Sequence, residues 1–296
     1  MAQKAVAAIV VTYNRLHYLK DCLDCIRNQI YTDFDIVVVN NGSTDGTEEF
    51  LSSQSDLIVI HQENLGGAGG FFSGLKYAVQ KGYHYCWLMD DDVICEPNAL
   101  EELVRAYHIK KDIGYVCSKV NGIDGCPMNT PVIDMKPAEN GYANYLELSE
   151  NNMIKVEMST FVSVLIGTNI IRKVGLPYKE YFIWGDDIEY TKRISNLYDC
   201  YVAYKSKVIH KRVDQQKLSF DNETDDGRLK NYFYKIRNTF HRQLLYRSPI
   251  LIWGYYILLW INCFGYLVKL DWNRFCIMAK ALCHIPFFHP RIVYLK

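Results

Sequence analysis

The first 107 residues alternate between short apolar runs and longer segments with helically spaced apolar side chains, and this alternation restricts the fold more than any other feature. The apolar runs predict strands at 5–12, 34–40, 57–61 and 85–89. Helical spacing predicts helices at 16–28, at 66–81 and after Pro97. Strands that alternate with helices build a mostly parallel sheet with helices on both faces. We therefore expect an α/β fold with a doubly wound, Rossmann-like sheet.

The pattern weakens after this region. Residues 119–156 predict a loop-rich insertion or a short antiparallel element near a site. Three further strands are expected at 161–166, 200–203 and 207–210, and a loop enters a helix within 181–194.

A run of three carboxylates follows the predicted strand at 85–89. Asp90, Asp91 and Asp92 lie where a parallel strand ends, which is where open α/β sheets bind ligands. Clustered carboxylates repel one another unless a cation binds them, and oxygen ligands suit Mn²⁺ or Mg²⁺. Because side chains alternate along an extended chain, Asp90 and Asp92 should share one side. The alternative is a solvated acidic turn that caps a helix.

A second acidic pair lies among aromatic residues. Asp186 and Asp187 follow Phe182 and Trp184 and precede a helical pattern. A carboxylate beside apolar rings is suited to act as a general base, and aromatic faces stack on sugars. The alternative is a pair of residues that cap the following helix.

Three other positions are candidates at the same sheet edge. His210 ends a strand and could be a third metal ligand, or a structural histidine. The glycine-rich run 66–70 opens a helix, where backbone amides could approach a diphosphate, or where small residues allow close packing. This run is neither a dinucleotide-binding fingerprint nor a Walker loop. The segment Thr12–Arg15 ends the first strand with polar groups and a cation.

Together these segments resemble the inverting nucleotide-sugar glycosyltransferases of family 2, which have the GT-A fold. The resemblance covers about residues 5–212 in the order of the family's motifs: Val10–Arg15, Asn40–Thr47, Asp90–Asp92, Asp186–Asp187 and His210. The chain has Asn40 and Asn41 where the family commonly has acids.

The resemblance implies a role for each residue. It implies that Asp187 is the catalytic base, with Trp184, Asp186 and Phe182 at the acceptor. It implies a Mn²⁺ or Mg²⁺ cofactor. The implied metal ligands are Asp90, Asp92 and His210. The implied donor-binding residues are Thr12, Arg15, Asn41, Asn64, Gly67, Asp90 and Asp91.

A narrower resemblance is to galactofuranosyltransferases, carried by Asn64–Phe71, the three aspartates and Trp184–Tyr190. It implies UDP-galactofuranose as the donor and a growing, lipid-linked surface glycan such as O-antigen or capsule as the acceptor. Related rhamnosyltransferases that use dTDP-rhamnose share much of the pattern and remain an alternative.

The C-terminal region differs in character from the rest. Residues 241–296 hold seven Lys and Arg against one acid, so the tail is +6 and the remainder −6. Residues 250–268 carry no formal charge and nearly reach the length of a membrane span, yet contain several Trp and Tyr, which prefer the membrane interface. We expect a glycosyltransferase domain at 1–215 and a linker with a helical, membrane-associating appendage at 216–296. The expected location is cytoplasmic, peripheral on the inner face of the cytoplasmic membrane.

Other function classes remain open. The zero net charge gives no indication of a nucleic-acid partner. A nucleotidyltransferase would have a glycine-rich basic loop at the end of the first strand, and Thr12–Arg15 fits this poorly. A non-catalytic, membrane-associated glycan- or nucleotide-binding scaffold is an alternative of another class. A homo-oligomer is possible, as is docking of a partner enzyme by the tail.

Overall fold

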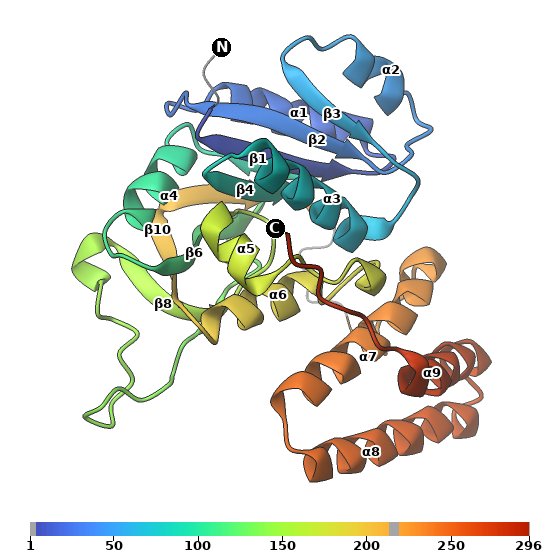
Figure 1. The fold of residues 1–296 in the computed structure, drawn as a ribbon. Helices are drawn as coiled ribbons and strands as arrows, with labels where there is room; N and C mark the ends of the chain where they lie inside the picture. Colours follow the sequence, from blue (N-terminus) through green and yellow to red (C-terminus); the bar gives the residue numbers. More distant parts are fainter. Residues whose placement is uncertain (1–3, 213–218, 296) are drawn as a thin grey trace.

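A computed structural model describes residues 4–212 and 219–295. Within those ranges ten strands form one mixed sheet in the order β3-β2-β1-β4-β9-β6-β10-β8-β7, with β5 paired to β10 (Figure 1). The strands are β1 Val6–Thr12, β2 Phe34–Asn40, β3 Leu57–His61, β4 Tyr85–Asp90, β5 Val93–Cys95, β6 Ile113–Gly122, β7 Val132–Ile133, β8 Met153–Met158, β9 Val164–Gly167 and β10 Asp199–His210.

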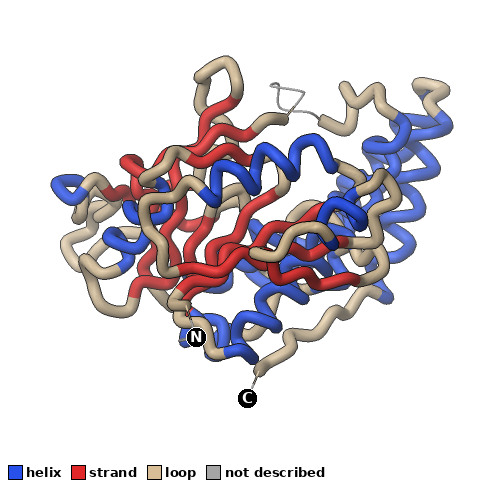
Figure 2. Tube along the Cα trace, turned by 90° about the horizontal axis from the view of Figure 1, so that it is seen from above, coloured by secondary structure: helices blue, strands red, loops and turns tan. Residues whose placement is uncertain are grey.

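Helices cover both faces of the sheet. The α-helices are α1 Leu16–Arg27, α2 Thr47–Ser52, α3 Gly66–Lys81, α4 Ala99–Tyr107, α5 Thr168–Val174, α6 Asp186–Ser195, α7 Asp226–Tyr246, α8 Pro249–Val268 and α9 Trp272–His284. One core contains apolar residues of α1, α2 and α4, and the other contains those of α3, α5 and α6. Figure 2 shows the strands between these layers, as expected for a doubly wound sheet.

The parallel strands set the position of the site. β1 lies between β2 and β4, and all three run in the same direction, as does β3 beside β2. Thr12 at the end of β1 is in register with Asn40 of β2, and Val11 is in register with Asp90 of β4. The carboxyl ends of these strands therefore bring the polar segments to one edge.

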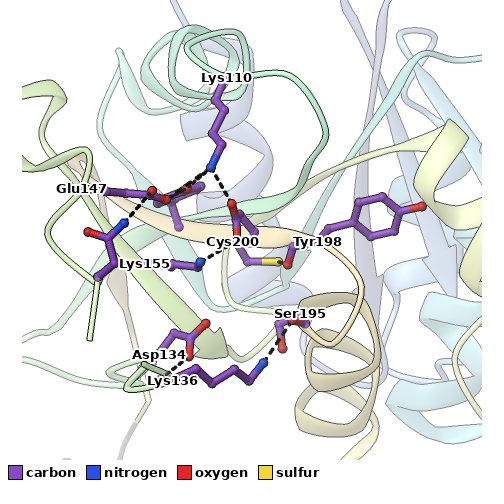
Figure 3. A network of polar contacts seen from close by, with 11 residues as sticks. Lys110, Asp134, Lys136, Glu147, Lys155, Ser195, Tyr198 and Cys200 are labelled. Carbon is purple, nitrogen blue, oxygen red and sulfur yellow. Dashed lines mark hydrogen bonds and ion pairs between the residues drawn. The ribbon is translucent and has the colours of Figure 1, made fainter. Parts of the chain in front are cut away.

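The insertion after β6 is tied to the opposite end of the sheet by charged contacts (Figure 3). Lys110 after α4 and Lys155 of β8 each lie 2.5 Å from a carboxylate oxygen of Asp199. Lys110 also lies 3.4 Å from Glu147, which belongs to the insertion. These contacts tie the insertion to α4 and β10, and the apolar side chains of Met128 and Leu148 pack against the core beneath it.

The last three long helices pack together at one end of the molecule (Figures 1 and 2). Their apolar residues form a separate core that includes Phe240 of α7, Leu259 of α8 and Met278 of α9. The chain then returns to the first part, where the Leu176 amide donates to the Val293 carbonyl at 2.8 Å. The appendage is thus tied to the α/β body at its far end as well.

Most of the expected elements are present, with five differences. The two strands expected at 200–203 and 207–210 are one strand, β10, with a register shift between Ala203 and Lys207. Residues 226–230, expected in a polar linker, begin α7, while 213–218 and the expected boundary at 215 lie outside the described residues. The glycine-rich run is the start of a helix, as predicted. Two short elements, β5 and α5, were not expected, nor was the strand β6 that begins at Ile113.

Candidate active site

Two carboxylates and an imidazole converge at the end of the sheet. One ligand atom from each of Asp90, Asp92 and His210 lies within 4.8 Å of the others. β4 ends at Asp90, and a turn brings Asp92 to the same side, as the alternation of side chains predicted. His210 ends β10, which pairs antiparallel with β5 directly after the turn. Residues 120 positions apart in sequence therefore meet through strand pairing.

A hydrogen bond orients the imidazole toward the carboxylates. His210 Nδ1 lies 2.8 Å from the Asn129 side-chain oxygen, which can only accept, so in the neutral ring the proton is on Nδ1 and the lone pair is on Nε2. Nε2 lies 3.0 Å from Asp92 Oδ1. Asn129 belongs to the insertion after β6 and has a positive φ of 48°. A partner of this kind on the second ring nitrogen is typical of metal-binding histidines.

The third aspartate faces the first strand. Asp91 Oδ2 accepts a hydrogen bond from the Thr12 hydroxyl at 2.7 Å. The guanidinium of Arg15 lies 2.7 Å from Asp92 and 3.5 Å from Asp91. Arg15 is half exposed, so it can contact a bound anion as well as the two carboxylates. These predicted donor-binding residues thus lie beside the predicted metal ligands.

The charges of this cluster shift its pKa values. Burial, followed by the charge of Asp92, raises the pKa of Asp90 to about 6. Burial also raises the pKa of Asp91 to about 7, with Arg15 opposing the shift. Burial alone would lower the pKa of His210, but the carboxylates of Asp92 and Asp90 outweigh it and raise the pKa. The site therefore concentrates negative charge that a cation would stabilise.

The donor set fits a divalent cation. Asp92 Oδ1 is buried and has no assigned hydrogen-bond partner among the described residues, and its charged neighbour is His210 Nε2 at 3.0 Å. A buried polar atom without a partner is costly unless a ligand binds it. Two carboxylates and one neutral imidazole suit Mn²⁺ or Mg²⁺. Asp90, Asp92 and His210 are thus able to hold a divalent metal.

The second pair of aspartates begins α6. Asp186 and Asp187 are the first residues of the helix, after Gly185 with a φ of 96°. Burial and the charge of Asp187 raise the pKa of Asp186 well above its usual range. Burial raises the pKa of Asp187 to about 6, with the charge of Asp90 adding to the shift. This contribution of Asp90 means that the helix start and the metal-ligand cluster are within electrostatic range.

The aromatic residues before this pair are held in an unusual backbone. Phe182 and Trp184 have φ values of 64° and 63°, in the left-handed region that side chains rarely adopt. The Phe182 ring stacks on Tyr234 of α7 at 4.7 Å, and Trp184 meets Tyr232 edge-on at 5.1 Å. Both of these predicted acceptor residues are partly exposed, whereas the third, Asp186, is buried. They are therefore ordered by α7 and still able to contact a ligand.

The glycine-rich run contains tightly packed positions and one open position. A side chain at Gly66 would meet the Phe182 carbonyl oxygen at 2.0 Å, and one at Gly70 would meet Val11, so close packing requires these two glycines. A side chain at Gly67 would meet nothing within 4 Å, so this position is open to a ligand. The start of α3 therefore packs against the loop that carries Phe182, while the position of Gly67 stays open.

Two predicted donor residues have internal roles. The buried side chain of Asn41 donates to the Gly66 carbonyl at 3.1 Å and accepts from Gln62 at 2.6 Å. Asn64 accepts from the Gly66 amide at 2.9 Å. Both side chains hold the loop that opens α3, and their contact with a donor stays a prediction.

The fold and this constellation define a GT-A glycosyltransferase, a class whose solved members include two with this architecture. The mannosyltransferase PcManGT from Pyrobaculum calidifontis, in complex with GDP-Man and Mn²⁺, aligns with 98% of this chain and 77% of its own at a TM-score of 0.57 and 15% identity. TarS 1–349 from S. aureus, in complex with UDP, aligns with 81% and 65% at a TM-score of 0.55 and 16% identity.

Sequence comparison identifies the family. The family model for glycosyl transferase family 2 matches residues 7–170, more than half of the chain, and the protein belongs to this family. Galactofuranosyltransferase GlfT1 of Mycobacterium tuberculosis is 27% identical over 201 residues, 64% of each protein. The putative glycosyltransferase EpsH of Bacillus subtilis is 32% identical over 117 residues. That alignment spans 38% of this chain and 33% of EpsH, so the chain spans one third of that relative.

Sequence reasoning missed three side chains near the site. Asn129 orients His210, and Arg237 and Asn238 of α7 bond the backbone of the loop before Asp186. Asn129 has no sequence signal within the irregular insertion. The signal for the α7 pair is a charged and an amide residue beside the apolar Ile236 and Phe240, where a purely apolar face would be expected.

Proposed function

We propose that this family 2 glycosyltransferase is metal-dependent and inverting, and that it transfers galactofuranose from UDP-galactofuranose to a lipid-linked surface glycan. The observation that carries the proposal is the convergence of Asp90, Asp92 and His210 beside an ionisable Asp187. A bound Mn²⁺ or Mg²⁺ would supply charge stabilisation for the departing nucleotide diphosphate. The solved relative with GDP-Man and Mn²⁺ supports a metal with a nucleotide sugar.

Asp187 takes part in the transfer step, and Phe182 and Trp184 bind the acceptor. Asp187 Oδ1 accepts the Ile188 amide at 2.7 Å, so Oδ2 is the atom left to take a proton. As the acceptor hydroxyl attacks the anomeric carbon from the face opposite the diphosphate, its proton passes to Asp187 and the bond to the diphosphate breaks. Inversion follows from this single displacement. Phe182 and Trp184 bind the acceptor and exclude water.

The choice of donor rests on likeness to one relative. GlfT1 is named a galactofuranosyltransferase, and its alignment covers a larger share of this chain than that of EpsH. TarS, a solved neighbour, binds UDP. A rhamnosyltransferase that uses dTDP-rhamnose is the alternative from the same resemblance.

The test is nucleotide release from a panel of nucleotide sugars, with Mn²⁺ and with a chelator. We expect metal-dependent UDP release from UDP-galactofuranose, increased by a galactofuranoside acceptor. Release of dTDP from dTDP-rhamnose would keep the mechanism and change the donor. Absence of both release and binding with every donor would refute the enzyme proposal.

We further propose that the appendage lies on an anionic membrane surface at the inner face of the membrane. Among the described residues, only the helix Pro249–Val268 is long and apolar enough to span a membrane. Of its most apolar 18-residue stretch, 11% is buried in the protein. A single such helix does not establish a membrane protein. Trp253, Ile257 and Phe264 are exposed on α8. The net charge of +6 over 241–296 complements anionic lipid.

Packing against α9 favours a surface location over a span. The Tyr256 hydroxyl of α8 donates to the Leu282 carbonyl of α9 at 3.1 Å. If α8 crossed the bilayer, α9 would enter it with Arg274 and the exposed Lys280, at a cost of about 2.5–3.5 kcal/mol for each charge at the bilayer centre. A helix on the surface leaves Lys280 in water and keeps Arg274 in its ion pair with Asp271, outside the bilayer.

Liposome flotation tests this location. Replacement of exposed Trp253 and Leu258 by Glu should abolish flotation with anionic vesicles and leave UDP release from soluble substrates unchanged. The matched control replaces Ile30 and Leu197, exposed on the α/β body and outside the candidate site, by Glu. Equal flotation of all three proteins would refute the surface proposal.

A further inference from the structure

The loop from Glu180 to Gly185 adopts a conformation that its own sequence does not favour. Phe182 and Trp184 both have positive φ, although neither is glycine. Left-handed backbone is unfavourable at such residues and persists only where surrounding contacts impose it. Contacts from outside the loop must therefore hold it.

Those contacts come from two adjacent residues of α7. The Asn238 side-chain amide donates to the carbonyls of Tyr181 and Trp184, each at 2.9 Å, and to that of Ile183 at 3.2 Å. Arg237 donates to the Glu180 carbonyl at 2.7 Å and to that of Tyr181 at 3.3 Å. The two side chains thereby bind four of the five carbonyls from 180 to 184.

The fifth carbonyl is bound from the other side. The Phe182 oxygen accepts the Ala68 amide of α3 at 3.1 Å. The loop therefore lies between the start of α3, which belongs to the α/β body, and α7, which belongs to the appendage. All five carbonyls from 180 to 184 are thus bound by elements distant in sequence.

Arg237 also fixes the orientation of Asn238. Its guanidinium donates to the Asn238 side-chain oxygen at 2.9 and 3.1 Å, which leaves the Asn238 amide nitrogen facing the loop. Both residues are buried, and the guanidinium lies 3.7 Å from the centroid of the Phe288 ring. These hydrogen bonds of Arg237 end on oxygens without formal charge. Because this buried guanidinium bonds uncharged oxygens, these bonds fix the positions of its partners and do not form an ion pair.

We propose that Arg237 and Asn238 are positioning residues for the acceptor side of the site. They hold Phe182 and Trp184 in place and set the start of α6, which carries Asp187. Neither residue belongs to the metal-ligand cluster, so they act on transfer and not on donor binding. The proposal deepens the proposed function and rests on it.

The test compares two reactions of the full-length protein. Metal-dependent hydrolysis of UDP-galactofuranose by water measures the donor site, while transfer to an octyl galactofuranoside also requires the acceptor loop. For Asn238→Ala we expect hydrolysis and the calorimetric affinity for UDP with Mn²⁺ to stay within twofold. Transfer, as kcat/KM for the acceptor, should fall about 100-fold, the effect of misplacing reacting groups by about 1 Å.

Two further variants complete the design. Arg237→Lys keeps the charge but loses the forked donor, so it should show the same selective loss of transfer, to a smaller extent. Gln243→Ala on the same helix is the matched control, because its side chain has no hydrogen bond among the described residues, and it should match the unaltered protein. Thermal unfolding of each variant checks that it folds.

The outcomes are separable. Unchanged transfer in both Asn238→Ala and Arg237→Lys, or a proportional loss of donor binding, hydrolysis and transfer, would overturn the positioning role and leave the proposed function intact. If the unaltered protein neither hydrolyses nor transfers from any nucleotide sugar, the proposed function and this inference both fall.

Discussion

Replacement of Asp187 by Asn tests the assignment of the catalytic base most directly. The amide has nearly the same shape as the carboxylate but cannot accept the proton of the acceptor hydroxyl. General-base catalysis contributes about 10²–10⁴-fold, which corresponds to about 3–5 kcal/mol of transition-state stabilisation. We therefore expect kcat for transfer to fall by that factor. The affinity for UDP with Mn²⁺ should be kept, because Asp187 is not in the metal-ligand cluster.

The pH dependence gives an independent test of the same group. Burial raises the pKa of Asp187 to about 6, and a base must be ionised to act. About nine-tenths of the carboxylate is ionised at pH 7 and about one-tenth at pH 5. Activity should thus be lost as the pH falls through about 6, rather than through about 4. Because the charge of Asp90 adds to this shift, saturating metal should move the midpoint somewhat lower.

The assay is UDP release with saturating Mn²⁺ from pH 5 to 8, with circular dichroism at each pH. Asp186→Asn is the matched control. Burial and its charged neighbour raise the pKa of Asp186 well above its usual range, so the ionised form is disfavoured and the amide is a close substitute. We expect that variant to keep at least about one-tenth of the activity. Full activity of Asp187→Asn, or greater loss from the Asp186 variant, would refute the assignment.

Two other substitutions test the metal site and the packing around it. Asp92→Ala should abolish the increase in UDP affinity that Mn²⁺ produces, measured by calorimetry, whereas Asp24→Ala, an exposed carboxylate, should not; equal stimulation by Mn²⁺ in both would contradict the ligand assignment. Gly66→Ala places a methyl group 2.0 Å from the Phe182 carbonyl at a φ of 72°, so the free energy of unfolding should fall by about 1–3 kcal/mol. Gly67→Ala, with open space, should be nearly neutral by thermal unfolding, and a similar loss in both variants would refute the packing argument.

The parts of the site that follow a strand could be predicted from the sequence. Parallel strands end at one edge, so locating β4 places Asp90, and the alternation of side chains places Asp92 beside it. His210 was predicted for the same reason, at the end of β10. The position of each strand can be read from its local sequence. The fold class then implies that the carboxyl ends of the parallel strands lie together.

The parts that depend on side chains from distant segments could not be predicted in this way. Asn129 lies in an insertion that is held by ion pairs and lacks a helical or strand period. Asn238 donates to backbone carbonyls. Every residue has a carbonyl, so no particular side chain in the sequence identifies the partner of Asn238. The positive φ of Phe182 is imposed by these contacts and is not encoded by a glycine.

The site therefore combines two halves of different origin. The half with Asp90, Asp92 and His210 is built from strand ends of the α/β body. The half with Asp187 begins a helix whose entry loop is held between α3 and α7. Since α7 also contributes Phe240 to the core shared with α8 and α9, the acceptor side is fixed to the same rigid element as the proposed membrane-docking face. Under the proposed function, a lipid-linked acceptor would meet Asp187 at a distance from the membrane set by the appendage, and a soluble nucleotide sugar would enter from the sheet edge. This division explains why loop-holding residues should affect transfer and spare donor binding.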